Sequence, residues 1–395
     1  MAIAAGNSRQ ISHVNEVTPG TDPGTPYTVD RFLAGARLFN EANEIKSGEM
    51  TSDRSVAPGA NGSKHAKFSG PFELSYGAHD DYIQSAMCAA WAAPATANTG
   101  ISGAVVAGTT NTLAGTGVGT GIVAGDWVKV SGFTAGYVAN NGYFRATAAS
   151  ANLLTFGEAK NAAGSSLLAA CTAQAGISTQ RMGYIASGST PRAVSIESAQ
   201  ADINVFERGL GMQMNRFSLS IRQGQVITGS FEGVGLQLPK PAAVKYRTGT
   251  DVAAATGAPM TGNATKSYVW LDGAVVAVVT GLDINLQNGM EDLIGVFQEV
   301  AYGILMGRSD LSGSITLAFT DSATMAKAFD GTRVALRFQV MDPLGTSGYA
   351  FDIPVVKLAL PGEDRQENKV FHSYNWQAEK DSVSGLVNMK ISKLA

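Results

Sequence analysis

The stretch Phe68-Ser-Gly-Pro-Phe-Glu-Leu-Ser-Tyr76 decides how this chain folds, together with the run Asp80-Asp-Tyr-Ile-Gln-Ser-Ala-Met-Cys-Ala-Ala-Trp91 that follows it. In the first run, hydrophobic residues alternate with small or polar ones, as in a strand with one buried face. The second run places hydrophobic residues at helical spacing: Ile83, Ala86, Met87, Ala90 and Trp91. The segment therefore predicts a strand followed by a short amphipathic helix, which Asp81 and Gln84 would cap and Pro94 would end.

A degenerate copy of this stretch lies in the last third of the chain. It reads Leu311-Ser-Gly-Ser-Ile-Thr-Leu-Ala-Phe319, followed by Ser322-Ala-Thr-Met-Ala-Lys-Ala-Phe329. Both copies share Ser-Gly, alternating hydrophobic residues and a helix-like run a few residues later. The repeat indicates two related domains in one chain. Chance similarity between two amphipathic strands is the alternative.

The length and composition are typical of a β-rich protein with several domains. A chain of 395 residues is expected to form two or three domains. Hydrophobic residues make up 45% of it, which is enough for real cores, whereas charged residues make up only 15%. A typical soluble domain carries about 25% charged residues. The weakly charged surface suits burial between subunits.

No feature of the sequence points to catalysis, a cofactor or a metal. The four histidines are scattered, and Cys88 and Cys171 form no metal or disulfide framework. The glycine-rich run 115–121 lacks the Gly-Lys-Ser/Thr ending of a phosphate-binding loop. His79-Asp80-Asp81 is the nearest approach to a site, but acidic residues at a helix start are better explained as capping. We expect no enzyme activity and no cofactor.

Charge and targeting signals exclude further classes. The formal net charge of −3 gives no basic footprint for nucleic-acid binding. No signal peptide is visible, and no stretch approaches the ~20 hydrophobic residues that a membrane helix needs. We therefore expect folding in a reducing cytoplasm, without a membrane anchor.

Changes in amino-acid composition along the chain predict its domain organisation. Residues 98–182 are rich in Gly, Thr and Ala and predict short strands that form a small sandwich or barrel of their own. We expect this unit to be inserted into a host domain. The expected order is an N-terminal arm at 1–27, a first domain at 28–97 and 183–240, the insert at 98–182, a linker at 241–266 and a second domain at 267–395.

Two segments look too long for simple hairpins, Ser47–Lys67 and Asn288–Asp310. Loops of this length usually carry function or are disordered. Each lies just upstream of a repeat strand, which favours function, and we expect subunit contacts there. The candidate contact residues are Asp53, Arg54, Val56, Asn61, Lys64, Glu291, Asp292 and Arg308.

Several blocks resemble the major tail tube proteins of long-tailed bacteriophages. They are the run Asn43–Arg54, Phe72-Glu-Leu-Ser-Tyr-Gly77 with Asp80, Asp81 and Trp91, and Gln225-Val-Ile-Thr-Gly-Ser-Phe231. The pattern at 125–145, Gly-Asp-Trp-Val…Asn-Asn-Gly-Tyr-Phe-Arg, is similar to small β-domains inserted in phage tail proteins. The resemblance implies a β-sandwich with a flanking helix. Together with the internal repeat and the insert, it predicts a mainly β fold: two tail-tube-like β-sandwich domains, each with a short flanking helix, plus the small inserted all-β domain.

The resemblance also implies a structural role in the virion tail. Such proteins assemble with themselves into rings that stack into a tube, meet other tail proteins, and let double-stranded DNA pass without specific binding. Family members are described with one such fold per chain and six chains per ring. Because this chain shows an internal repeat, we favour three copies per ring with pseudo-sixfold symmetry; six copies remain the alternative. Assembly would take place in the cytoplasm of the host bacterium.

A carbohydrate-binding module on the tail or capsid surface is the alternative function. It would use the 98–182 unit, and would show aromatic residues clustered on one exposed face. The available aromatic residues are Trp127, Phe133, Tyr137, Tyr143 and Phe144. Core packing would explain most of them equally well.

Overall fold

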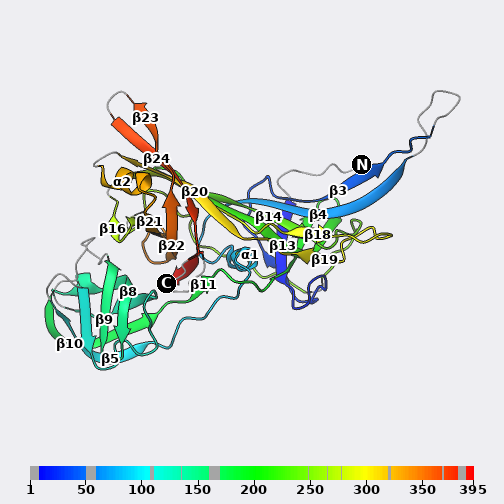
Figure 1. Ribbon diagram of the computed structural model, residues 1–395. Coiled ribbons are helices and arrows are strands. Elements are labelled where there is room, and N and C mark those ends of the chain that lie inside the picture. The colour runs from blue at the N-terminus through cyan, green and yellow to red at the C-terminus, as the bar shows by residue number, and fades with distance from the viewer. Residues whose placement is uncertain are drawn as a thin grey trace.

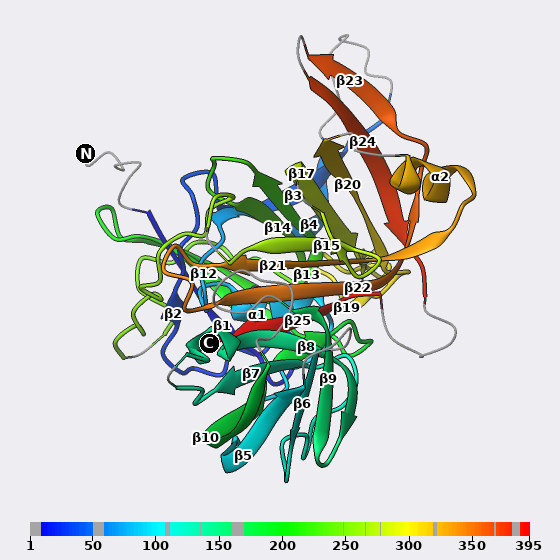
Figure 2. The ribbon, with the colours of Figure 1, turned by 90° about the vertical axis from the view of Figure 1, so that its left-hand side faces the viewer.

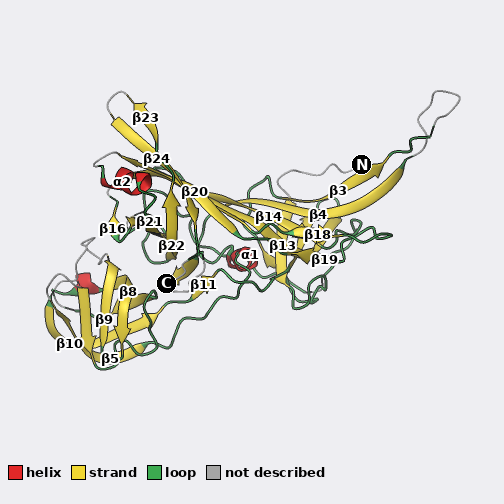
Figure 3. Ribbon diagram, in the orientation of Figure 1, coloured by secondary structure: helices red, strands yellow, loops and turns green. Residues whose placement is uncertain are grey.

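The computed structural model shows a mainly β protein, as the sequence predicts (Figure 3). It describes the ranges 9–49, 59–106, 111–134, 136–159, 170–247, 249–264, 266–276, 278–318, 322–366, 369–380 and 388–395. Within these residues, two short α-helices accompany the strands: α1 (Asp80–Ala86) and α2 (Ala323–Phe329).

The strands fall into three groups along the chain. Before and after the small barrel described below lie β1 (Arg9–Asn15), β2 (Thr28–Val29), β3 (Arg37–Ile45), β4 (Ala60–Glu73), β11 (Tyr184–Ala186), β12 (Val194–Gln200), β13 (Val205–Arg222) and β14 (Thr228–Gly235). The barrel holds β5 (Asn98–Val106), β6 (Asn111–Gly115), β7 (Trp127–Ser131), β8 (Gly142–Ser150), β9 (Leu153–Ala159) and β10 (Cys171–Arg181). The rest are β15 (Tyr268–Leu271), β16 (Ala274–Val275), β17 (Val279–Gln287), β18 (Glu291–Leu293), β19 (Gly303–Leu305), β20 (Asp310–Ala318), β21 (Arg333–Met341), β22 (Gly348–Leu358), β23 (Gly362–Gln366), β24 (Lys369–Ala378) and β25 (Lys390–Leu394).

One long antiparallel sheet, which we call the main sheet, runs through both halves of the chain (Figure 1). Its strands pair in the order β3-β4-β14-β13-β17-β20-β24-β23. The first four strands come from the N-terminal half and the last four from the C-terminal half. At the junction, Arg216–Arg222 of β13 pair with Gly281–Gln287 of β17. The two halves are therefore joined edge to edge by backbone hydrogen bonds.

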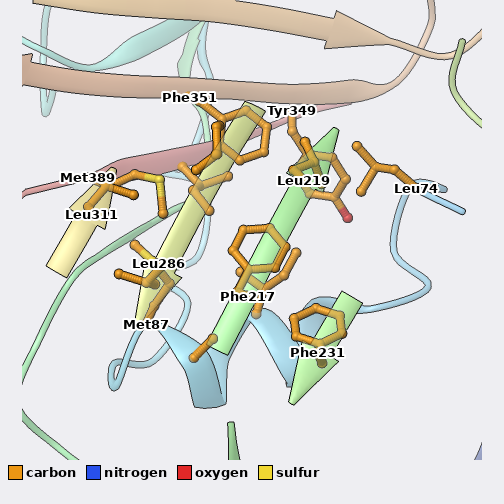
Figure 4. Packing of buried hydrophobic residues seen from close by; sticks show 14 of the residues in the cluster. Leu74, Met87, Phe217, Leu219, Phe231, Leu286, Leu311, Tyr349, Phe351 and Met389 are labelled. Carbon is orange, nitrogen blue, oxygen red and sulfur yellow. The ribbon is translucent and has the colours of Figure 1, made fainter. Parts of the chain in front are cut away.

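A second layer of strands covers one face of the main sheet and encloses the core. β1 and β12 pair beside β13, and β21, β22 and β25 cross the C-terminal half. Figure 4 shows Phe217, Leu286 and Leu311 of the main sheet facing Phe351 of β22 and Met389. All five side chains are buried. The core is one continuous hydrophobic cluster that spans both halves of the chain.

The helix predicted over residues 80–91 is shorter than expected. α1 ends at Ala86, and Cys88 then adopts a left-handed backbone with φ 49°. The predicted capping box is absent, because His79 is the N-cap and makes no side-chain capping bond. Asp80 instead accepts a 2.6 Å hydrogen bond from the Tyr349 hydroxyl, while Trp91 Nε1 donates to the Asp80 carbonyl at 2.9 Å. Tertiary contacts therefore replace local capping.

The two copies of the repeated motif form the same local structure. Gly70 lies in β4 and Gly313 in β20, and α1 and α2 begin at the same distance after these glycines. A Cβ atom on Gly313 would lie 2.0 Å from the carbonyl oxygen of Asp283 and 2.5 Å from the Trp376 ring. Only glycine fits there, because an aromatic side chain lies directly over the strand.

The strands β5 to β10 close into a separate six-stranded barrel (Figure 2). Its closure runs through β10–β5, β5–β6, β6–β9, β9–β8, β8–β7 and β7–β10. The barrel has its own hydrophobic core, which includes Leu113, Val128, Phe144 and Leu154. A closed barrel leaves no free strand edge.

Polar and aromatic contacts fix the barrel against the second layer. Asp352 of β22 lies between two arginines, with Arg145 Nε of the barrel and Arg337 Nε of β21 each 2.8 Å from one of its oxygens. Beside them, the rings of Trp127 and Trp270 pack with centroids 6.0 Å apart. The barrel is thus held by a defined interface as well as by its two chain connections.

We expect Asp352→Ala to loosen this interface. The change removes a buried carboxylate from between two guanidinium groups and should cost roughly 3 kcal/mol. Hydrogen exchange should rise at the strands that flank the interface, β7, β8 and β22. Strands β5 and β6 on the barrel's other side should keep their protection. Equal loss of protection throughout the barrel would contradict the prediction.

Candidate assembly surfaces

The structure brings the two predicted contact segments together, but neither is a plain loop. β4 already begins at Ala60, so much of the first segment is strand, and the second segment contains β18 and β19. Both segments are the distal parts of long hairpins, β3–β4 and β17–β20. Pairing satisfies their backbone hydrogen bonds, which is why the prediction of two extended loops was wrong for these parts.

The predicted contact residues have different surroundings. Asp53, Arg54 and Val56 lie outside the described residues. Asn61 is exposed on β4 opposite Glu44, and Glu291 is exposed on β18 opposite Leu305.

Lys64 and Asp292 take part in a contact between the two hairpins. The β18–β19 hairpin lies against the end of β4 and beside β14 (Figure 1). Lys64 Nζ lies 2.6 Å from Glu299 Oε1, and the Lys64 backbone N–H donates to the Glu299 carbonyl at 2.9 Å. His65 Nδ1 lies 2.5 Å from Asp292 Oδ2. The long hairpin of the C-terminal half thus docks on the sheet of the N-terminal half.

The docked hairpin presents hydrophobic side chains to the outside. Val296, Phe297 and Tyr302 are all highly exposed, and Phe297 has a left-handed backbone with φ 68°. A group of exposed hydrophobic residues on a projecting hairpin is typical of a protein contact surface. The sequence prediction named charged residues in this segment and missed these three.

Both ends of the main sheet have open edges. Within the described part of the chain, β3 pairs only with β4, and β23 pairs only with β24. An unpaired edge offers a row of backbone N–H and C=O groups to another strand. Backbone groups at both ends of the main sheet are therefore available to pair with a further strand.

The face of the main sheet that points away from the core is polar. Ser218 and Ser230 hydrogen bond across strands at 2.7 Å, and Arg222 pairs with Asp283 at 2.7 Å. Burial alone would raise the pKa of Asp283, but hydrogen bonds from Arg222 and two serines outweigh it and hold that pKa below its usual value. On the same face, Arg216 lies 3.5 Å from Glu232. These arginines are each matched by a carboxylate.

A buried charged network ties the N-terminal segment to α1, and nothing in the sequence pattern signalled it. His13 Nδ1 lies 2.7 Å from Asp30 Oδ1, and His13 Nε2 lies 3.0 Å from Asp81 Oδ2. The Tyr82 hydroxyl donates to Asp30 at 2.7 Å. Burial would lower the pKa of His13, but the two carboxylates raise it to about 10. His13, Asp30 and Tyr82 are buried between β1, β2 and α1, and Asp81 reaches the surface, so we interpret the network as structural.

The barrel shows no cluster of exposed aromatic rings among the five candidates. Trp127, Phe133 and Phe144 are buried, and Tyr137 and Tyr143 are half-buried. Core packing accounts for them better than carbohydrate binding does.

The described residues show neither a metal-binding cluster nor a helix that could span a membrane. They contain no group of three or more His, Cys, Asp or Glu side chains arranged to hold a metal ion. None of their helices has the length and hydrophobicity to cross a membrane.

The family model for phage tail tube protein matches residues 6–378, nearly the whole chain. No curated protein matches the sequence.

Proposed function

This chain belongs to the phage tail tube protein family, and from that premise we propose that its copies close into rings that stack into the tube of a long-tailed phage. The tube is the conduit for genome delivery. Assembly takes place in the host cytoplasm, and other tail proteins meet the tube at its ends. The role is structural, without catalysis or a cofactor.

The junction between β13 and β17 carries this proposal. The four-stranded sheet of the N-terminal half and the four-stranded sheet of the C-terminal half meet there edge to edge within a single chain. The outer edges, β3 at one end and β23 at the other, are unpaired in the described chain. In the ring that we propose, β23 of one copy pairs with β3 of the next copy. This heterologous contact repeats the arrangement of the β13–β17 junction between copies and closes the ring.

The number of copies follows from the two sheets per chain. We divide the chain into two tube domains, residues 28–97 with 183–240 and residues 267–395, with a linker at 241–266 and the barrel at 98–182 as an insert. The N-terminal arm at 1–27 is not free along its length, because its strand β1 pairs with β12. Three copies then supply six similar sheets and give a pseudo-sixfold ring. Six copies, with twelve sheets, are the alternative. The barrels sit on the outside of the ring.

The polar face of the main sheet is the surface we assign to the lumen. Double-stranded DNA must slide along this wall. Basic side chains without an acidic partner would bind its phosphates and are therefore unfavourable there. Arg216 and Arg222 on this face are each paired with a carboxylate of a neighbouring strand, whereas Arg37 of β3 lies over the ring of Phe39. Such a wall is consistent with passage of double-stranded DNA without specific binding.

Mass measurement together with electron microscopy tests the proposal. We expect hollow tubes or stacked rings, and a ring mass of three times the chain mass of 40.9 kDa. A ring of six times the chain mass would replace the pseudo-sixfold arrangement by a hexamer. A chain that stays monomeric at every concentration would overturn the assembly itself.

A further inference from the structure

The two halves of the chain each carry a long hairpin, and the two hairpins differ in what they contact. In the C-terminal half, β17 and β20 continue into β18 and β19, and this hairpin docks on β4 and β14. In the N-terminal half, the β3–β4 hairpin projects away from the body (Figure 1). We call the described residues 40–49 and 59–66 of this hairpin the projecting arm, which is distinct from the N-terminal arm at 1–27. One docking contact is thus made inside the chain, and its counterpart is not.

The repeated motif identifies which residues correspond in the two hairpins. Aligning Gly70 with Gly313 places His65 at the position of Arg308. Leu38 pairs with Phe68, and Leu286 pairs with Leu311, which is the equivalent of Phe68. Counting onward from these leucines places Glu44 at the position of Asp292.

Because the two hairpins correspond, the contact seen between His65 and Asp292 predicts a contact between the equivalent residues, Arg308 and Glu44. Inside the chain, His65 pairs with Asp292. At the equivalent place on the second half, Arg308 is exposed, and no ion pair is recorded for it among the described residues. Glu44 on the projecting arm is also exposed. The charges are complementary, as they are in the pair already formed.

A groove lies where the projecting arm would dock. It has a volume of about 540 Å³ and runs along the ends of β20, β22 and β24. The residues that line it include Asp310, Ser312, Lys357, Asn375, Gln377 and Glu379. These ends of β20 and β24 correspond to the ends of β4 and β14, on which the β18–β19 hairpin docks.

We propose that the projecting arm of one copy docks into this groove on the next copy, with Glu44 facing Arg308 of the partner subunit. Each copy gives one projecting arm and receives one, so the contact is heterologous and closes with the ring. The proposal rests on the ring assembly proposed above, because it places the two copies side by side through β3 and β23.

Charge reversal with rescue tests the contact. The variants are Arg308→Glu, Glu44→Arg and the two combined, with Lys129→Glu on the barrel as a control for the change in charge. Because Lys129 Nζ donates to the Ala395 carbonyl at 3.0 Å, thermal unfolding of this control is measured as well. Each single variant should raise the concentration needed for half-assembly about fivefold, the scale of a surface ion pair, and the combined variant should restore it. Because both residues are exposed, thermal unfolding of the monomer should not change.

The outcomes separate this contact from the assembly as a whole. Rings that form normally in both single variants, or single defects that the combined variant fails to rescue, would overturn the projecting-arm contact and leave the ring intact. An unaltered chain that never assembles would overturn both proposals. A defect of equal size in Lys129→Glu would show a nonspecific charge effect and would also overturn the contact.

Discussion

Gly313→Ala is expected to destabilise the chain by roughly 3–5 kcal/mol, although it adds a single methyl group. The new Cβ would lie 2.0 Å from the carbonyl oxygen of Asp283, a backbone atom of the neighbouring strand β17. It would also lie 2.5 Å from the ring of Trp376. Because β20 is paired on both sides, neither strand can move away without breaking its hydrogen bonds. Urea unfolding of the isolated chain measures the loss.

Two other glycines provide the comparison. Gly303→Ala is the matched control, because a Cβ there meets nothing within 4 Å, and its stability should be unchanged. Gly70→Ala should cost less than Gly313→Ala, since its close neighbours are the ring atoms of Phe68 and Phe32, which can shift. Equal stability of Gly313→Ala and Gly303→Ala would show that the strand adjusts to the added methyl group. Steric exclusion would then not explain why glycine occurs in both copies of the motif.

His13→Leu is the second change for which we expect a large effect, roughly 3–5 kcal/mol of lost stability. The substitution leaves the buried carboxylate of Asp30 with the Tyr82 hydroxyl as its remaining bond in the network, and it also releases Asp81. His65→Ala is the control, because that histidine is half-exposed and its pair with Asp292 should contribute less than about 1 kcal/mol. Similar losses for both variants would contradict a special role of the buried network.

The same network gives the chain a pH dependence on the alkaline side. The pKa of His13 is about 10 in the folded state, above its ordinary value of 6.5, so the folded state binds this proton more tightly. Its contribution to stability is complete below pH 6.5 and is lost as the pH rises toward 10, with a slope of up to about 1.4 kcal/mol per pH unit. Unfolding measured at about pH 7 and about pH 9.5 should show this loss in the unaltered chain. His13→Leu should lack that part of the slope.

The strand–helix motif shows what could be predicted from local sequence. Alternation correctly predicted the strands over 68–73 and 311–318, because side-chain direction in a strand depends only on neighbouring residues, although β4 ends before residues 74–76. The end of α1 was predicted less well. Residues after Ala86 have a helical pattern, but contacts of Asp80 and Trp91 with distant parts of the chain compete with helix continuation.

The contact residues show the limit of loop-based prediction. Lys64 and Asp292 of the two long segments make contacts within the chain, whereas the subunit contacts expected of these segments stay a prediction. The hydrophobic surface around Phe297 was missed, because a lone hydrophobic residue in a loop gives no sign of whether the fold will cover it.

Subunit contacts at the two long segments stay a prediction, but the β class and the repeated strand–helix motif with its glycine could be predicted from local sequence. These follow from periodicity and turn chemistry, which act over a few residues. Long-range packing set the features that local sequence left open: the two halves share one sheet through β13 and β17, Arg222 of the polar face pairs with Asp283, and His13 joins Asp30 and Asp81. Those contacts join residues far apart in the chain, and their partners are chosen by packing and burial of the whole fold.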